Sequence, residues 1–149
     1  MNEGDRHSVS VAGVILDDAG RALLIQRRDN SHWEAPGGIL EVDEDIRAGL
    51  KREVLEETGL QVHVEHLTGV YKNMKRGIVA LVFRCRVLGG SVRETNEAQD
   101  LRWMGLEEVR ALATEAFAVR VLDAMADPLT SPAVRHHDGT HLIGETFGS

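Results

Sequence analysis

Three glutamates in the segment REVLEE, residues 52–57, are spaced so that they can act together. On a helix with about 100° between residues, Glu53, Glu56 and Glu57 share an arc of about 100°. Their like charges repel one another, and they do so more strongly where water is removed. Ligand sets made only of oxygen suit hard divalent cations such as Mg²⁺ or Mn²⁺, which also bind phosphate oxygens. The segment is therefore a candidate metal site, and the alternative is a solvated acidic helix face paired with neighbouring bases.

A Pro-Gly-Gly turn at residues 36–38 precedes this helix, and Arg27 and Arg28 precede the turn. Glycine lets the backbone come close to a ligand or to another chain segment. Guanidinium groups suit pyrophosphate oxygens, so both arginines are candidate substrate-binding residues. Because adjacent strand residues point to opposite faces, we expect only one of them to reach the site. A solvated strand residue is the alternative for each.

A longer pattern surrounds these residues. It consists of Gly38, five residues, Glu44, seven residues, and then REVLEETGL at residues 52–60. This 23-residue stretch resembles the Nudix box and matches each of its fixed positions. The one visible departure is Asp43, where many members carry glycine, and it lies among the variable positions. The resemblance extends over about residues 8–127 and does not reach the C-terminal tail.

The resemblance implies the reaction and the residues that carry it. Nudix enzymes hydrolyse a nucleoside diphosphate linked to another group, X, with divalent cations such as Mg²⁺ or Mn²⁺ as cofactor. By this resemblance Glu53, Glu56 and Glu57 are catalytic, metal-binding carboxylates. Gly38 adds its backbone carbonyl to the metal ligands.

The resemblance also implies roles for residues around these carboxylates. Glu44 and Arg52 are expected to support the site, and Arg52 stands four residues before Glu56, a spacing that allows a pair. Tyr71 is a candidate substrate-binding residue that could stack on a base, as is Trp33. Packing in the core is the commoner role of an isolated aromatic residue.

The proton acceptor is expected to be Glu53 or Glu97. Several members carry a catalytic or metal-binding acid in the loop before the last strand, where Glu97 stands. Glu94 competes with Glu97 for this role. The alternative for Glu97 is a solvated loop acid.

The order of apolar and polar residues predicts an α/β or α+β sandwich without an interdomain linker. The resemblance implies the fold more closely, as a single α/β domain with a Nudix-type α/β/α sandwich and a mixed sheet. Residues 1–7 are expected to be loose, residues 8–127 to form the Nudix domain, and residues 128–149 to be a tail of unknown role. Asp45 is the expected N-cap of the acidic helix and Gly59 its C-terminal cap. Pro128 and Pro132 are expected to end the regular structure. The expected strands are 8–16, 21–28, 61–75, 77–88 and 101–104, and the expected helices are 45–58, 106–113 and 115–127.

The composition limits the classes of partner. The 149 residues carry a net charge of −7, which disfavours phosphate-neutralising nucleic-acid binding and an anionic membrane surface. Residues 41–57 hold seven acids and three bases, so much of this charge belongs to the candidate site, and an RNA 5′ end stays open as a partner.

Neither a signal peptide nor a membrane span is recognisable, which favours a cytoplasmic protein. The single cysteine, Cys85, falls on the apolar side of its strand and is expected to be a buried structural thiol.

The tail carries His136, His137 and His141. Their spacing would allow a transition-metal site, but few acids are nearby and the segment has no periodicity. We therefore expect a flexible or surface-docked tail.

The resemblance implies Mg²⁺- or Mn²⁺-dependent hydrolysis of a pyrophosphate linkage. A nucleoside triphosphate is the expected substrate, because the chain is short and no accessory domain is recognisable. Hydrolysis of ADP-ribose or a nucleotide-sugar is the nearest alternative. A catalytically silent Nudix-like domain that senses a nucleotide is a second, and an unrelated acidic-helix interaction protein is a third. A monomer and a homodimer are both compatible with the sequence, which leaves open the base, the sugar, X and the phosphorus that is attacked.

Overall fold

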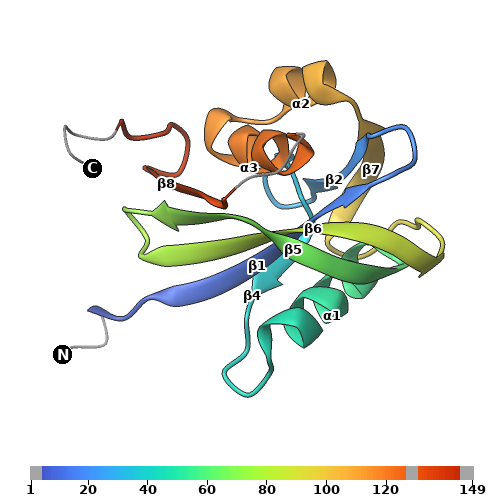
Figure 1. Ribbon diagram of the computed structural model, residues 1–149, viewed down its shortest axis with the longest axis horizontal. Helices are drawn as coiled ribbons and strands as arrows, with labels where there is room; N and C mark the ends of the chain where they lie inside the picture. The colour runs from blue at the N-terminus through green and yellow to red at the C-terminus, as the bar shows by residue number, and fades with distance from the viewer. Residues whose placement is uncertain (1–4, 127–130, 145–149) are drawn as a thin grey trace.

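The computed structural model describes residues 5–126 and 131–144. Within them a curved mixed sheet lies between helix α1 on one side and helices α2 and α3 on the other (Figure 1). The strands are β1 (Ser8–Leu16), β2 (Ala22–Arg27), β3 (Trp33–Glu34), β4 (Gly37–Ile39), β5 (Leu60–Asn73), β6 (Ile78–Gly90), β7 (Ala98–Met104) and β8 (Ala133–His137). The helices are α1 (Ile46–Thr58), α2 (Leu106–Leu112) and α3 (Glu115–Met125).

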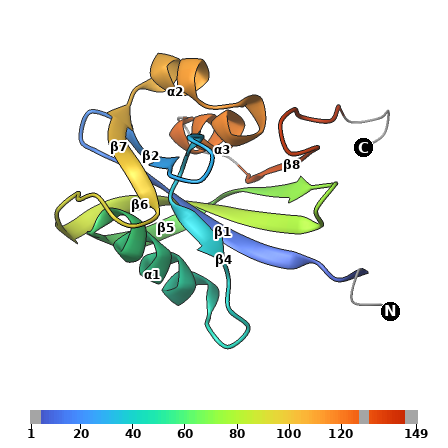
Figure 2. The same cartoon turned by 180° about the vertical axis from the view of Figure 1, so that it is seen from behind.

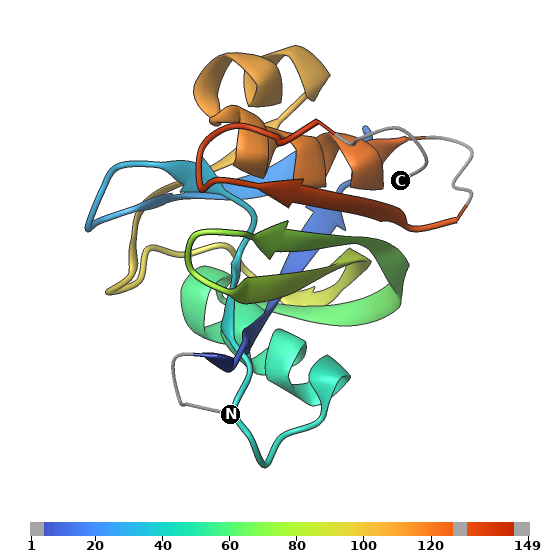
Figure 3. The same cartoon turned by 90° about the vertical axis from the view of Figure 1, so that its left-hand side faces the viewer.

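The sheet has the order β3-β2-β1-β6-β5-β8, with β4 also paired to β1 and β7 to β2. The pairs β1–β6 and β5–β8 are parallel, and the other pairs are antiparallel. The expected α/β sandwich with a mixed sheet is therefore confirmed. Figure 3 shows its layers from the side, with α1 below the sheet and α2 and α3 above it.

Strand β1 is buried on both faces, as its unbroken apolar run predicts. Val11 and Ile15 point towards α1, where they pack with Leu50 and Val54. The alternate residues Ala12 and Val14 belong to the core on the α3 side of the sheet. The two faces of one strand thus join two separate cores, and α1 is held by the first.

Helix α1 begins and ends where its sequence predicts. The Asp45 side chain accepts a hydrogen bond from the Ala48 N–H at 2.8 Å, and Gly59 adopts a left-handed φ of 84° at the C-terminal end. Leu50 and Val54 are fully buried, whereas Ile46 stays partly exposed. Cys85 is buried in the same core, as expected, and burial raises the pKa of its thiol to about 12.

Two short strands lie outside the expected strands and helices, and one of them includes the glycines of the expected Pro-Gly-Gly turn. β3 pairs with β2, and β4 pairs with β1 through Gly37 and Gly38, opposite Ala12 and Val11. Figure 2 shows β4 running along β1 towards the start of α1. The expectation was wrong because these strands have only two and three residues, too few for a periodic pattern to be visible.

The expectation that regular structure ends near Pro128 and Pro132 was also wrong. β8 adds a parallel strand to the edge of β5, with Val134 opposite Val70. It is held from α3, where the Asp123 carboxylate accepts two hydrogen bonds from Arg135, both at 2.8 Å. His137 is buried, and its Nε2 lies 3.1 Å from a nitrogen of Arg120.

Several expected boundaries shift by a few residues, including those of β5, β6 and β7. Residues 1–4, 127–130 and 145–149, which belong to the expected N-terminal segment, last helix and tail, lie outside the described residues. No helix in the described part of the chain is long and apolar enough to cross a membrane.

Candidate metal and active site

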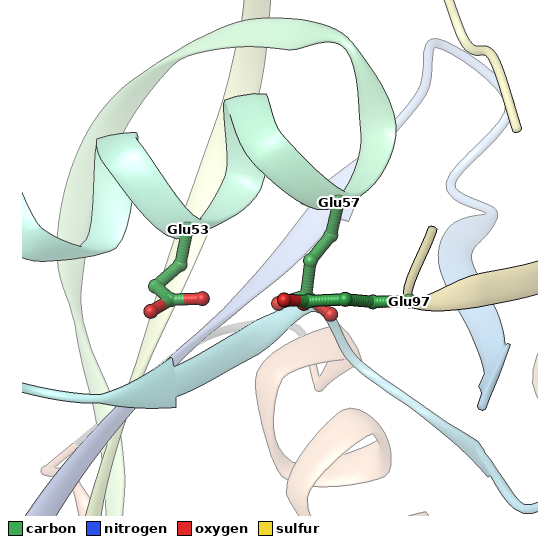
Figure 4. A group of neighbouring side chains, drawn as sticks. All are labelled: Glu53, Glu57 and Glu97. Carbon is green, nitrogen blue, oxygen red and sulfur yellow. The ribbon is translucent and has the colours of Figure 1, made fainter. Parts of the chain in front are cut away.

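Three carboxylates meet beside the C-terminal half of α1. Glu53 and Glu57 are four residues apart and therefore share one face of the helix, and Glu97 approaches them from the segment between β6 and β7 (Figure 4). Each side chain offers one oxygen, and these oxygens all lie within 4.8 Å of one another. Glu57 is buried, Glu53 is partly buried and Glu97 is exposed. Among the described residues this is the one such group of acidic, histidine or cysteine side chains.

Burial and mutual repulsion make this group a poor place for three negative charges. The pKa of Glu57 is raised to about 8, chiefly because burial removes water from its carboxylate, and the charges of Glu53, Glu97 and Glu34 add to the effect. A 2.9 Å hydrogen bond from the Gly37 N–H partly opposes it. Burial also raises the pKa of Glu53. A cation bound among the oxygens would relieve both effects, so the residues present fit a hard divalent ion.

The glycines of the turn allow the backbone to approach the acidic helix. A β-carbon on Gly38 would lie 2.6 Å from the carboxyl carbon of Glu53, so glycine leaves room for that carboxylate. A β-carbon on Gly37 would lie 2.1 Å from the Val11 carbonyl oxygen, so glycine is needed there for β4 to pair with β1. The structure thus places Gly38 beside the carboxylate group.

Arg52 links the acidic loop to the helix. It donates to the two carboxylate oxygens of Glu44 at 2.6 and 2.9 Å, and these bonds lower the pKa of Glu44 to about 2. It also donates to Glu53 at 3.1 Å and lies 3.4 Å from Glu56. The pair of Arg52 and Glu44 therefore holds the middle of α1 to the preceding loop, and Arg52 orients Glu53.

Glu56 is not brought into the three-oxygen group. Its side chain is exposed, pairs with Arg52, and borders a hollow of about 490 Å³ next to the site. Residues 93–97 form the rest of the lining, including Glu94 and Arg93. Glu97 is the one residue of the carboxylate group that lines this hollow.

The two arginines that were expected to bind substrate pair with other groups of the protein. Arg27 pairs with Asp29 at 2.8 Å and with Glu34 at 3.1 Å. Arg28 donates two hydrogen bonds to the Thr95 carbonyl, at 3.1 and 3.2 Å.

The structure does not bring Tyr71 to the carboxylates. Its side chain is fully buried in the core on the α3 side of the sheet, and its hydroxyl donates to Asp123 at 2.6 Å. Stacking on a base requires an exposed ring face, which Tyr71 does not have. Trp33 is buried in the same core.

Two residues near the site were not predicted. Glu34 contributes to the raised pKa of Glu57 and pairs with Arg27. The Thr95 hydroxyl donates to the Glu57 carbonyl at 3.3 Å, although the residues are far apart in the sequence. No spacing rule connects these positions, so only the folded chain shows them.

The sequence and the fold both have known relatives. The family model described as NUDIX domain matches residues 6–125. The chain is 53% identical over 137 residues to a MutT-like protein of Streptomyces ambofaciens, covering 92% of this chain and 88% of the relative. It is 33% identical over 113 residues to an ADP-ribose pyrophosphatase of Methanocaldococcus jannaschii, covering 71% of this chain and 66% of the relative.

Solved structures show the same fold. A MutT protein from Methanosarcina mazei Go1 superposes with a TM-score of 0.69 at 27% identity, covering 83% of this chain and 94% of that one. An ADP-ribose pyrophosphatase from Streptococcus suis superposes with a TM-score of 0.74 at 20% identity, covering 89% and 100%. The second likeness, at this low identity, concerns the fold alone.

Proposed function

The chain belongs to the Nudix hydrolase family, and we propose on that basis that it hydrolyses the pyrophosphate linkage of a nucleoside triphosphate or a related nucleoside diphosphate compound at Glu53, Glu57 and Glu97. The meeting of these three carboxylates beside a solvent-open hollow carries the proposal. Family members use a divalent metal, and the oxygen-only group favours Mg²⁺ or Mn²⁺ as the resident ion. Hydrolysis of ADP-ribose is the second candidate, because a relative that is 33% identical carries that activity in its name.

Glu53 and Glu57 would hold the metal together with Glu97. When bound, the ion supplies positive charge for the pyrophosphate oxygens and makes water more acidic. Arg52 keeps the Glu53 carboxylate in place through its 3.1 Å hydrogen bond. Gly38 would add its carbonyl, and exposed Glu56 would lie at the side of the site that faces the hollow.

Glu97 is the better of the two candidate proton acceptors. It borders the hollow, whereas Glu53 is already tied to Arg52. One of the two Glu97 carboxylate oxygens belongs to the three-oxygen group and would bind the metal. The other oxygen can accept the proton of the attacking water. The water oxygen then forms a bond to one phosphorus of the pyrophosphate linkage, and the bond from that phosphorus to the bridging oxygen breaks. The other phosphate leaves with the bridging oxygen and with the group that it carries.

The test is a substrate panel of nucleoside triphosphates, ADP-ribose and nucleotide-sugars with Mg²⁺ or Mn²⁺, with products separated by chromatography. We expect turnover by the wild type and a loss of about 100-fold or more in Glu57→Gln. Glu107→Gln is the matched control, since Glu107 is an exposed acid paired with Arg110 on α2. It should retain full activity.

Two results would contradict the proposal. A wild type that binds nucleotides but turns over nothing on the panel would indicate a nucleotide-sensing domain. Unchanged turnover in Glu57→Gln would show that the carboxylate group has been assigned the wrong role.

A further inference from the structure

Glu97 does not belong to α1, so a separate part of the chain must bring it to Glu53 and Glu57. That part is the Glu97 segment, defined as residues 91–97, between β6 and β7. Three like charges in one group repel one another, and an exposed side chain on a loop would swing into solvent unless its backbone were held. The contacts of the Glu97 segment show how it is held.

The first attachment is to the end of α1. The Arg93 N–H donates to the Thr58 carbonyl at 3.0 Å, and the Thr95 hydroxyl donates to the Glu57 carbonyl at 3.3 Å. Carbonyls in the last turn of a helix lack partners within the helix and are free to accept such bonds. Gly59 permits the close approach, since a β-carbon there would lie 2.5 Å from the Ser91 carbonyl oxygen.

The second attachment is to Arg28, directly after β2. Its guanidinium donates to the Thr95 carbonyl at 3.1 and 3.2 Å, and its backbone N–H donates to the Glu97 carbonyl at 3.1 Å. Thr95 therefore donates to α1 through its hydroxyl and accepts from Arg28 through its carbonyl. The same hydroxyl accepts from the Ala98 N–H at 3.4 Å, at the start of β7.

We propose that Arg28 and Thr95 are positioning residues that hold Glu97 within reach of Glu53 and Glu57. The inference rests on the proposed function, because Arg28 and Thr95 position a functional group only if Glu97 takes part in the reaction. It also assigns Arg28 a different role from that of a phosphate ligand.

The first test is Thr95→Val beside Thr95→Ser. Valine keeps the shape of the side chain but cannot donate to Glu57, whereas serine can. We expect Thr95→Val to weaken Mn²⁺ binding, measured by calorimetry with the metal alone, and to lower kcat by about tenfold, with KM within about twofold of wild type. Thr95→Ser should stay close to wild type in both measurements.

Thr68→Val is the matched control. The Thr68 hydroxyl likewise donates to a backbone carbonyl, that of Val82 in the neighbouring strand at 3.1 Å, and Thr68 does not contact the carboxylate group through this bond. It should lose stability without losing Mn²⁺ affinity or kcat. Circular dichroism and thermal melting establish that each variant is folded before it is compared.

Arg28→Met separates positioning from phosphate binding. Positioning predicts a lower kcat and weaker Mn²⁺ binding with nearly constant KM, whereas a phosphate ligand predicts a raised KM and unchanged Mn²⁺ affinity. Arg21→Met is the control on the same part of the chain, because Arg21 is exposed and pairs with Asp17.

A double-mutant cycle with Glu97→Gln decides whether the two residues act through Glu97. We expect Thr95→Val to cost less than about twofold in kcat when Glu97 is already glutamine. Full additivity would overturn the inference, as would wild-type Mn²⁺ affinity and kcat in both Thr95→Val and Arg28→Met. Those results leave the proposed function intact if the wild type and Glu57→Gln behave as predicted above, whereas an inactive wild type counts against the function itself.

Discussion

Gly38 leaves room for the Glu53 carboxylate of the proposed metal site. A β-carbon on Gly38 would lie 2.6 Å from the carboxyl carbon of Glu53, so any side chain at this position would displace the carboxylate. The neighbouring Gly37 serves the fold instead, because its β-carbon would collide with the backbone of β1. Two adjacent glycines with the same appearance in the sequence therefore meet different requirements.

We expect Gly38→Ala to damage the site more than the fold. The new β-carbon would displace the Glu53 carboxylate, so Mn²⁺ affinity should fall by about tenfold or more. Because a flexible side chain can move aside, the free energy of unfolding should change by about 1 kcal/mol or less. Calorimetry with Mn²⁺ and urea denaturation measure the two effects.

Gly105→Ala is the control for this substitution, since nothing lies within 4 Å of a β-carbon built on Gly105. Mn²⁺ binding by Gly38→Ala that equals the control would mean that Glu53 does not need its observed position.

Among the elements, α1 is specified by its own residues, whereas β8 depends on residues that are distant in the sequence. α1 could be predicted because its cap, its apolar spacing and its terminal glycine all lie within its own sequence. β8 has five residues, and its stability comes from β5 and from Asp123 in α3, which contacts both Tyr71 and Arg135. The five residues of such a strand show little pattern from which the strand could be predicted.

Asp123→Ala should loosen β8. It removes the acceptor of the Tyr71 hydroxyl and of two Arg135 hydrogen bonds, so we expect the free energy of unfolding to fall by about 2–3 kcal/mol. Amide hydrogen exchange should accelerate in Ala133–His137 more than in β1 or β6. The control Glu107→Ala breaks an exposed ion pair on α2 and should cost less than about 1 kcal/mol. Equal exchange rates in β8 of Asp123→Ala and wild type would show that Asp123 does not hold this strand.

At the scale of the whole molecule, the net charge of −7 is concentrated around the site. Residues 41–57 carry seven acids and three bases. The fold buries one of these acids, Glu57, beside Glu53 and beside Glu97 from another part of the chain. An anionic substrate would be repelled by this region unless a cation neutralised it. On the proposed function, the acidity of the protein reflects its metal site more than a general property of its surface.

The raised pKa of Glu57 in this acidic region predicts how the stability of the metal-free protein depends on pH. The pKa of Glu57 is about 8 in the folded chain, whereas an unperturbed glutamate, as in the unfolded chain, has a pKa of 4.5. Between these values the folded chain retains the proton and the unfolded chain releases it, so stability falls as the pH rises through this window. Glu57→Gln should remove this loss and stabilise the metal-free protein at about pH 8 by on the order of 2 kcal/mol.

Urea denaturation in the presence of a chelator, from about pH 5 to about pH 8, measures the effect. The difference between wild type and Glu57→Gln isolates this group from His137, whose lowered pKa acts in the opposite direction below about pH 6.5. Parallel curves for the two proteins would contradict the prediction. Saturating Mn²⁺ should stabilise the wild type at high pH and Glu57→Gln much less, because the ion binds the folded state.

The sequence by itself determined the family and the acidic helix, because short-range spacing controls helix geometry and the 23-residue box is contiguous. It predicted Glu53, Glu56 and Glu57 on one arc of that helix, and two of them, Glu53 and Glu57, meet in the carboxylate group. It also predicted the two-sided burial of β1 from an unbroken apolar run. Only the tertiary structure decided that Glu97 rather than Glu56 joins Glu53 and Glu57, and that Tyr71 lies in the core. Those outcomes depend on contacts such as Thr95 with Glu57 and Tyr71 with Asp123, between residues distant in the chain, and no local pattern records which distant segments will meet.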